Sequence, residues 1–73
     1  MAATGINAGA IKIVELVGIS KKSFDDAVAQ AVKKASESIK GINGVEIISQ
    51  SAKVSGSKIV SYRANVKLAF AVK

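Results

Sequence analysis

The chain has 73 residues, a formal net charge of +6, no cysteine and no histidine. A chain of this length forms one small domain and buries only roughly 60% of its unfolded surface, so its own core is marginal. The missing residue types exclude disulfides, the usual zinc, haem and iron–sulfur sites, and catalysis by cysteine or by a histidine triad. Oligomerisation or a bound ligand is what remains to add stability.

The first nine residues, MAATGINAG, contain no positively charged leader and no long apolar run. They predict a flexible N-terminal arm and no signal peptide. No segment approaches the roughly 20 apolar residues of a membrane span, so we expect no membrane partner and a cytoplasmic location. Residues 10–73 are then expected to form a single domain.

Residues 10–18, AIKIVELVG, are short and rich in β-branched side chains, which predicts a β-strand. One face of this strand carries Lys12, Val14 and Leu16, and the other carries Ile11, Ile13, Glu15 and Val17. Because apolar residues occur on both faces, we expect both to be at least partly covered, the second one by another copy of the chain.

Residues 23–41, SFDDAVAQAVKKASESIKG, are predicted to form a helix. Ser23 is a good N-cap, and Asp26 three positions later gives a weaker version of the capping box. Gly41 is placed where a glycine commonly terminates a helix. The apolar residues recur at helical spacing and form one alanine-rich stripe: Phe24, Ala27, Val28, Ala31, Val32, Ala35 and Ile39.

Residues 44–54 and 58–73 are predicted to be two strands joined by a tight turn at residues 55–57, SGS. The last strand alternates strictly, so that one of its faces is wholly apolar and the other is mainly polar. The apolar face consists of Val60, Tyr62, Ala64, Val66, Leu68, Phe70 and Val72.

The order strand, helix, strand, strand predicts an α+β fold in which a three-stranded antiparallel sheet wraps around one helix. The last strand, residues 58–73, is expected in the middle of this β-α-β-β sheet. The other two strands are then edges, which invite pairing with other chains. A small core and exposed edges together predict a homo-oligomer.

No catalytic residue is assigned, and we expect no enzyme activity. The adjacent Asp25 and Asp26 are explained by the positive end of the helix dipole. Glu15 and Glu46 could meet across subunits and bind a cation, but pairing with Lys12 or Lys67 on a neighbouring strand is the preferred interpretation. The sequence therefore assigns no metal site.

Gly41 and Gly44 form a Gly-x-x-Gly in a basic chain, a pattern that clamps nucleic acid when it joins two helices. Here it joins a helix to a strand, and the strand aromatics belong to the apolar face, where core packing explains them better than base stacking. A basic-patch contact to nucleic acid through Lys53, Arg63 and Lys67 is kept as a remote alternative.

Four segments in chain order resemble the dodecin family: KIVELVGIS (12–20), SFDDAVAQAVKKASESI (23–39), VEIISQ (45–50) and YRANVKLAFAV (62–72). The resemblance covers roughly residues 11–73. It implies the fold predicted above, assembled into a hollow homododecamer. It also implies storage of small ligands and no catalysis, since many dodecins bind riboflavin, lumichrome or FMN in pairs at subunit interfaces. Some dodecins also carry coenzyme A or metal-ion sites.

The resemblance implies cofactor-binding roles at Gly44, Glu46 and Arg63. In flavin-binding dodecins a Trp that stacks on the flavin precedes the x-Glu of the second strand, and here that position is Gly44, before Glu46. The chain contains no Trp. Arg63 aligns with a second flavin contact, often a Gln, and could stack on a flat ring or pair with a phosphate; a salt bridge to a carboxylate of another subunit is the preferred interpretation.

Two functions are therefore carried forward. The first is a homododecameric protein that binds a small flat or phosphorylated ligand, with FMN and riboflavin as candidates and with flavin binding weakened or altered by the loss of stacking. The second is a flavin-free shell of the same fold that serves a structural or an ion- or metabolite-storage role.

Overall fold

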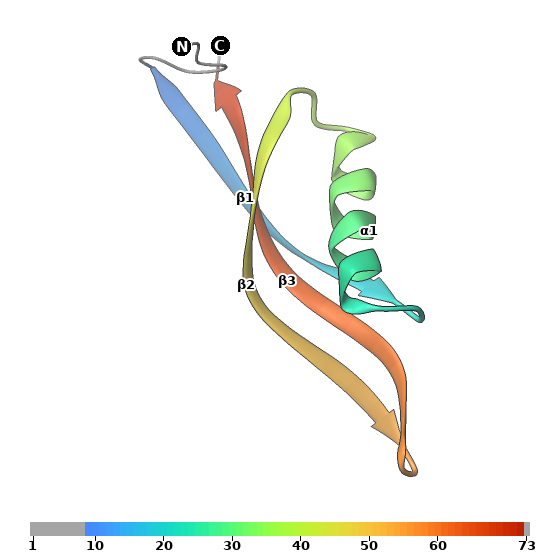
Figure 1. Cartoon of the computed structure of the whole chain (residues 1–73). Helices are drawn as coiled ribbons and strands as arrows, with labels where there is room; N and C mark the ends of the chain where they lie inside the picture. Colours follow the sequence, from blue (N-terminus) through green and yellow to red (C-terminus); the bar gives the residue numbers. More distant parts are fainter. Residues whose placement is uncertain (1–8, 73) are drawn as a thin grey trace.

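The computed structural model describes residues 9–72, so the predicted arm lies outside the described residues except for Gly9. The elements are β1 (Ala10–Ser20), α1 (Phe24–Ser36), β2 (Ile42–Ser55) and β3 (Lys58–Val72) (Figure 1). This order confirms the predicted β-α-β-β arrangement. β1 and β2 are longer than predicted, β3 begins at the predicted residue, and the helix is shorter than predicted.

The three strands form one antiparallel sheet in the order β1-β3-β2, which confirms β3 as the central strand. β1 pairs with β3 without interruption, from Ala10 opposite Val72 to Ser20 opposite Tyr62. Beyond that point β2 and β3 continue alone as a two-stranded arm that projects past the helix (Figure 1). The arm closes in a two-residue turn whose first residue, Gly56, has a φ of +65°, as hairpin turns of this length require.

The pairing of β2 with β3 is irregular. Its register shifts at three places, which leave Asn43 and Ile48 unpaired on β2 and Val60 unpaired on β3. Each extra residue reverses the side-chain alternation of the strand that contains it. The bulge at Ile48 therefore puts Glu46 and Ser49, instead of Glu46 and Ile48, on the same face of the sheet.

The start of α1 confirms Ser23 as the N-cap, because its hydroxyl accepts a hydrogen bond from the Asp26 backbone N–H at 3.0 Å. The second hydrogen bond of the predicted capping box, from the Ser23 backbone N–H to the Asp26 carboxylate, does not form. The Asp26 carboxylate instead accepts a 2.6 Å hydrogen bond from the buried Ser20 hydroxyl, at the end of β1. This contact ties the strand directly to the helix.

The end of α1 corrects the role predicted for Gly41. The helix ends at Ser36 and is capped by Glu37, so the Gly41 position lies beyond it. Gly41 has a φ of +76° immediately before β2, which makes it a turn residue that redirects the chain into the sheet. The serines at 36 and 38 favour the early end, because their hydroxyls compete for backbone hydrogen bonds.

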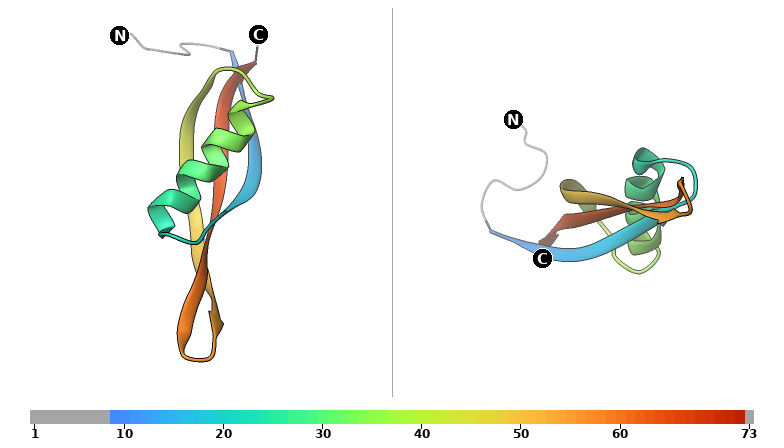
Figure 2. Two further views of the ribbon diagram at one scale, coloured as in Figure 1. Left: turned by 90° about the vertical axis from the view of Figure 1, so that its right-hand side faces the viewer. Right: turned by 90° about the horizontal axis from the view of Figure 1, so that it is seen from below.

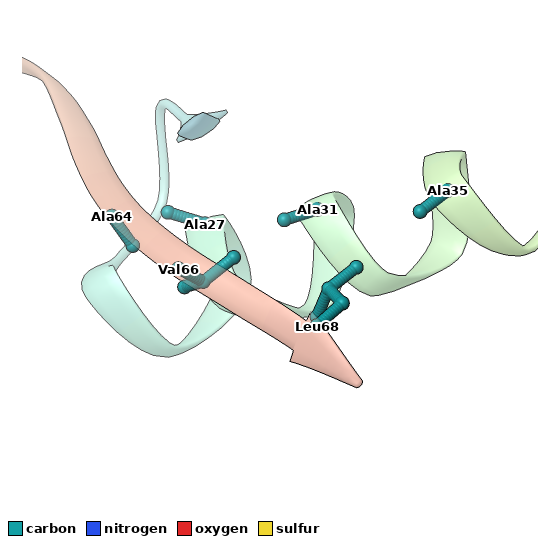
Figure 3. Close-up of a cluster of buried hydrophobic side chains, with 6 residues drawn as sticks. All are labelled: Ala27, Ala31, Ala35, Ala64, Val66 and Leu68. Carbon is teal, nitrogen blue, oxygen red and sulfur yellow. The ribbon is translucent and has the colours of Figure 1, made fainter. Parts of the chain in front are cut away.

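The core lies between α1 and the central strand (Figure 3). Three helix alanines face Ala64, Val66 and Leu68 of β3, and all six side chains are buried: Ala27, Ala31, Ala35, Ala64, Val66 and Leu68. Gly18 of β1 permits the close approach, since a β-carbon there would overlap the carbonyl oxygen of Ala27. Tyr62 packs edge-on against Phe24 with their ring centroids 4.9 Å apart, which confirms its predicted place under the helix.

One short helix cannot cover the whole sheet. It packs mainly on β1 and β3 and crosses only the middle of the sheet (Figure 2). The predicted apolar face of β3 is therefore covered only in part, and Val60 and Val72 at its ends are exposed. Large apolar side chains are also exposed on the other strands: Ile11, Ile13, Val17, Ile19, Val45, Ile47, Ile48 and Val54.

Candidate functional site

All three predicted ligand-binding residues lie on the sheet face opposite α1, which we call the outer face. Ala64, Val66 and Leu68 point towards the helix, so Arg63, Lys67 and the other alternate residues of β3 point to the outer face. Gly44 lies opposite Ala69, and Glu46 lies opposite Lys67. The sheet register thus brings Gly44 and Glu46 together.

Arg63 lies apart from these two residues. It is four positions along β3 from Lys67, which corresponds to roughly 13 Å at the usual rise of a strand. A single copy of the chain therefore places the predicted ligand-binding residues at two separate positions on the outer face. A ligand that contacts Arg63 and Glu46 together needs a second copy of the chain, or must itself span this distance.

Gly44 leaves space on the outer face. A β-carbon built at this position would meet only the Ala69 β-carbon, at 3.6 Å, which is an ordinary contact. Its φ is not positive, so the backbone accepts any L residue. Neither the backbone conformation nor the neighbouring atoms of Gly44 therefore require glycine here. The absence of an aromatic side chain at this position is a property of the sequence and not a steric necessity.

Glu15 and Glu46 lie on either side of Lys67, in one row across the three strands. This register favours the predicted interpretation in which a lysine balances the glutamates, and of the two predicted lysines it selects Lys67. Lys12 lies opposite Phe70, three positions along β3 from Lys67 and on the other face of the sheet. The Lys67 ammonium is not within 4 Å of either carboxylate, since the only ion pair in residues 9–72 joins Lys34 and Glu37 on the helix, at 3.9 Å.

A polar group around Arg63 was not predicted as a unit. Ser51 lies opposite Arg63, Ser49 opposite Asn65, and Lys53 opposite Ser61. Strict alternation from Glu46 would have assigned Gln50 to this face, and only the bulge at Ile48 puts the three residues of β2 here. The periodicity of the sequence carries no sign of that bulge.

Two surface hollows lie near the start of β2. One has a volume of about 510 Å³ and is lined by Ser38, Ile39, Lys40, Gly41, Phe70 and Ala71. The other has a volume of about 270 Å³ and is lined by Val32, Ile42, Asn43, Gly44 and Val45. Neither hollow includes Glu46 or Arg63, so neither unites the predicted ligand-binding residues.

Residues 9–72 contain no group of three or more carboxylates that could hold a metal ion by themselves. Over the same range, α1 is the sole helix, and its 13 residues are too few to cross a membrane.

The family model described as Dodecin matches residues 10–73 of this chain. The curated protein Calcium dodecin of Mycobacterium tuberculosis is 29% identical over 59 residues, which cover 81% of this chain and 83% of that protein. The crystal structure of the same calcium dodecin superposes with a TM-score of 0.77, covering 89% of this chain and 93% of the other.

Two further solved structures share the fold at lower identity. A dodecin from Streptomyces coelicolor gives a TM-score of 0.88 at 22% identity and covers 93% of this chain and 97% of its own. The tt0972 protein from Thermus thermophilus gives 0.85 at 20% identity and covers 90% and 97%. These likenesses confirm the predicted fold across nearly the whole chain.

Proposed function

This chain belongs to the dodecin family, and on that premise we propose that it is a homododecameric protein that binds and stores a small ligand, with its flavin site weakened. Dodecins are small binding and storage proteins that form homo-oligomers, and we assign no catalytic role to this chain. Gly44, Glu46 and Arg63 are its proposed ligand contacts. All three lie on the outer face, and a single copy does not bring Arg63 together with Gly44 and Glu46.

One observation supports the homo-oligomer: among the 64 residues that the structure describes, 9–72, eleven large apolar side chains are exposed. They occur on both faces of the sheet, including Ile13 and Val17 on the outer face and Val45 and Ile47 on the helix side. A soluble monomer rarely exposes contiguous apolar surface of this kind. Copies of the chain that pack against these strands would bury this surface.

The weakened flavin site is argued from Gly44. A stacked aromatic pair contributes roughly 0.5–1.5 kcal/mol beyond the area it buries, and a pair of flavins sandwiched between two symmetry-related rings would lose two such contributions here. Since about 1.4 kcal/mol corresponds to a tenfold change in affinity, we expect binding weaker by one to two orders of magnitude than with the rings present.

Light scattering coupled to size-exclusion chromatography tests the assembly, and fluorescence titration with riboflavin tests the ligand. We expect one species at about a dozen times the 7.5 kDa of the chain, stable on dilution, because the buried apolar surface opposes dissociation. We expect a weak but saturable change in riboflavin fluorescence. A stable monomer would contradict the assembly, and riboflavin fluorescence that is unaffected at high protein concentration would contradict flavin binding.

The second candidate function is a flavin-free shell that stores an ion or metabolite. It is supported by the relative named as a calcium dodecin and by Glu15 and Glu46, which lie at one level of the sheet. Isothermal titration calorimetry with Ca²⁺ distinguishes the two. Saturable Ca²⁺ binding that is lost in Glu46→Gln, in a protein without affinity for riboflavin, would favour the shell.

A further inference from the structure

The larger of the two surface hollows lies at the end of the sheet where the connection from α1 enters β2, and we call it the end hollow. It has a volume of about 510 Å³, and its lining is mainly apolar. The lining residues are Ser38, Ile39, Lys40, Gly41, Phe70 and Ala71. Sites for small organic ligands typically have volumes of about 300–1,000 Å³, so the end hollow is large enough for such a ligand.

The early end of α1 explains the apolar walls of the end hollow. Phe70 is the alternate residue after Leu68, the last β3 residue of the buried core, so its ring points to the helix side of the sheet. Because α1 stops at Ser36, this ring is left only partly buried. Ile39 of the connection packs against the core and forms another wall. Phe70 and Ile39 therefore offer apolar surface to a ligand.

Two lysines give the end hollow a positive charge. Lys40 lines it, and Lys12 lies directly opposite Phe70 on the same face of the sheet, where the β-carbons of cross-strand neighbours are about 5 Å apart. Both lysines are exposed, and within the described part of the chain neither has a carboxylate within 4 Å. Glu37, the one acid of the connection, is paired with Lys34. An anion from outside the chain can therefore balance this charge.

The polar part of the lining offers one cation and one hydroxyl to the head group of a ligand. The Lys40 ammonium can donate to one oxygen, and the Ser38 hydroxyl can donate to a second. A carboxylate has two oxygens and a single negative charge, so these two donors match it. A phosphate monoester carries a charge of about −1.5 to −2 and three acceptor oxygens, which exceeds what these two side chains supply.

We propose that the end hollow binds an organic carboxylate with an apolar body, such as a medium-chain alkyl carboxylate. The carboxylate contacts Lys40 and Ser38, and the apolar body lies against Phe70 and Ile39. Lys12 adds electrostatic attraction at longer range. The end hollow is separate from the ligand contacts of the proposed function, which all lie on the outer face of the sheet. It therefore adds a second binding site of different chemistry.

Calorimetric titration of the full chain with octanoate, butanoate, 1-octanol and octylamine tests the ligand class. We expect saturable binding of octanoate below the concentration at which it forms micelles. Butanoate should bind at least tenfold more weakly, because its shorter chain buries less apolar surface. The uncharged 1-octanol should bind at least threefold more weakly, and the cationic octylamine should not bind. Equal affinity of octanoate and butanoate, or of octanoate and octylamine, would overturn the proposal.

Lys40→Gln should weaken octanoate binding about fivefold, the upper range for an exposed ion pair, and leave 1-octanol binding unchanged. Lys33→Gln is the matched control, since it removes the same charge from the exposed surface of α1, and it should leave both affinities unchanged. Ser38→Glu keeps Lys40 but supplies it with a carboxylate of the chain, so it should abolish the preference for octanoate over 1-octanol. Equal losses in Lys40→Gln and Lys33→Gln would mean that only the net charge of the chain attracts octanoate, and the site would be wrong. Light scattering verifies that each variant assembles as the parent chain does.

Riboflavin titration separates this inference from the proposed function. Saturating octanoate should leave the riboflavin affinity unchanged, because the two sites lie on opposite faces of the sheet. If riboflavin fails to bind while octanoate binds through Lys40, flavin binding falls and the end hollow stands. If octanoate fails to bind, or octyl phosphate binds at least tenfold more tightly than octanoate, the carboxylate site is wrong and flavin binding is unaffected. Smaller species in light scattering after addition of octanoate would show that a second copy of the chain occupies the hollow, and would also overturn the proposal.

Discussion

At the scale of single residues, two strand glycines show opposite constraints. Gly18 lies where the helix meets β1, and a β-carbon there would overlap the Ala27 carbonyl oxygen and lie 3.0 Å from the Ala31 β-carbon. Gly44 lies on the outer face with only the Ala69 β-carbon nearby, at 3.6 Å. Glycine at 18 is therefore required by packing, whereas glycine at 44 is open to substitution.

We predict that Gly18→Ala destabilises the protein by about 3 kcal/mol or more, because the added carbon forces backbone atoms of α1 to move. Gly44→Ala is the matched control and should change the stability by less than about 1 kcal/mol, since its new methyl group makes an ordinary contact. Chemical denaturation at one fixed protein concentration measures both. Equal effects of the two substitutions would show that the close helix approach at Gly18 is wrong.

We predict that Gly44→Trp increases the affinity for riboflavin at least tenfold and strengthens the quenching of its fluorescence. The indole supplies the stacking surface that the chain lacks, and the backbone and the space at this position accept a side chain. Fluorescence titration of the variant and of Gly44→Ala measures the gain. If both variants bind riboflavin equally, stacking at this position does not limit affinity.

At the scale of elements, the junction of β1 and α1 is held by one serine. The Ser20 hydroxyl donates to the Asp26 carboxylate at 2.6 Å and accepts the backbone N–H of Lys22 at 2.8 Å. It also accepts a longer bond, of 3.4 Å, from the N–H of Ser23, the N-cap. Because these groups lie on both sides of the turn, one side chain fixes the direction in which the helix leaves the strand.

We predict that Ser20→Ala lowers the free energy of unfolding by about 1–3 kcal/mol, since it leaves the Asp26 carboxylate and a backbone N–H without their partner in a site where Ser20 is only 6% exposed. Ser38→Ala, at an exposed position after the helix, should cost little. Thermal and chemical denaturation compare the two variants. A loss no larger than that of Ser38→Ala would mean that the junction does not depend on this network.

At the scale of the whole molecule, the chain is an elongated sheet with one helix on part of one face (Figure 2). Its fully buried core consists of six side chains, four of them alanine. A core this small, together with the exposed apolar side chains on both faces, favours stability through assembly. Within one copy, Arg63 lies apart from Gly44 and Glu46, so we expect ligand binding at these proposed contacts to depend on assembly.

We predict that Val17→Glu shifts the protein to smaller species on size-exclusion chromatography with light scattering. The substitution places a charge in the exposed apolar surface of β1, where burial by a second copy would strip its water. Ala29→Glu, at an exposed position of α1, is the control and should elute as the parent chain does. A Val17→Glu protein of unchanged mass would place the interface elsewhere on the sheet.

The sequence by itself determined the elements, their order, the central position of β3 and the family, because alternation in β3 and helical spacing in α1 are strong local signals. It also identified Gly44 as the position where an aromatic side chain is absent, since this absence can be read directly from the sequence. The sequence predicts a helix end at Gly41, whereas α1 ends at Ser36. The prediction is wrong because a glycine with positive φ can follow a helix directly or lie in the turn before a strand, and the sequence does not distinguish the two.

Only the tertiary structure decided which residues share the outer face of β2. The bulge at Ile48 moves Ser49, Ser51 and Lys53 opposite Arg63, and a single unpaired residue leaves no mark on the periodicity. The tertiary structure also decided how little of the sheet one helix covers and which lysine lies between the two glutamates. These features depend on strand register and on the contact between layers, and both are set by pairings between residues far apart in the chain.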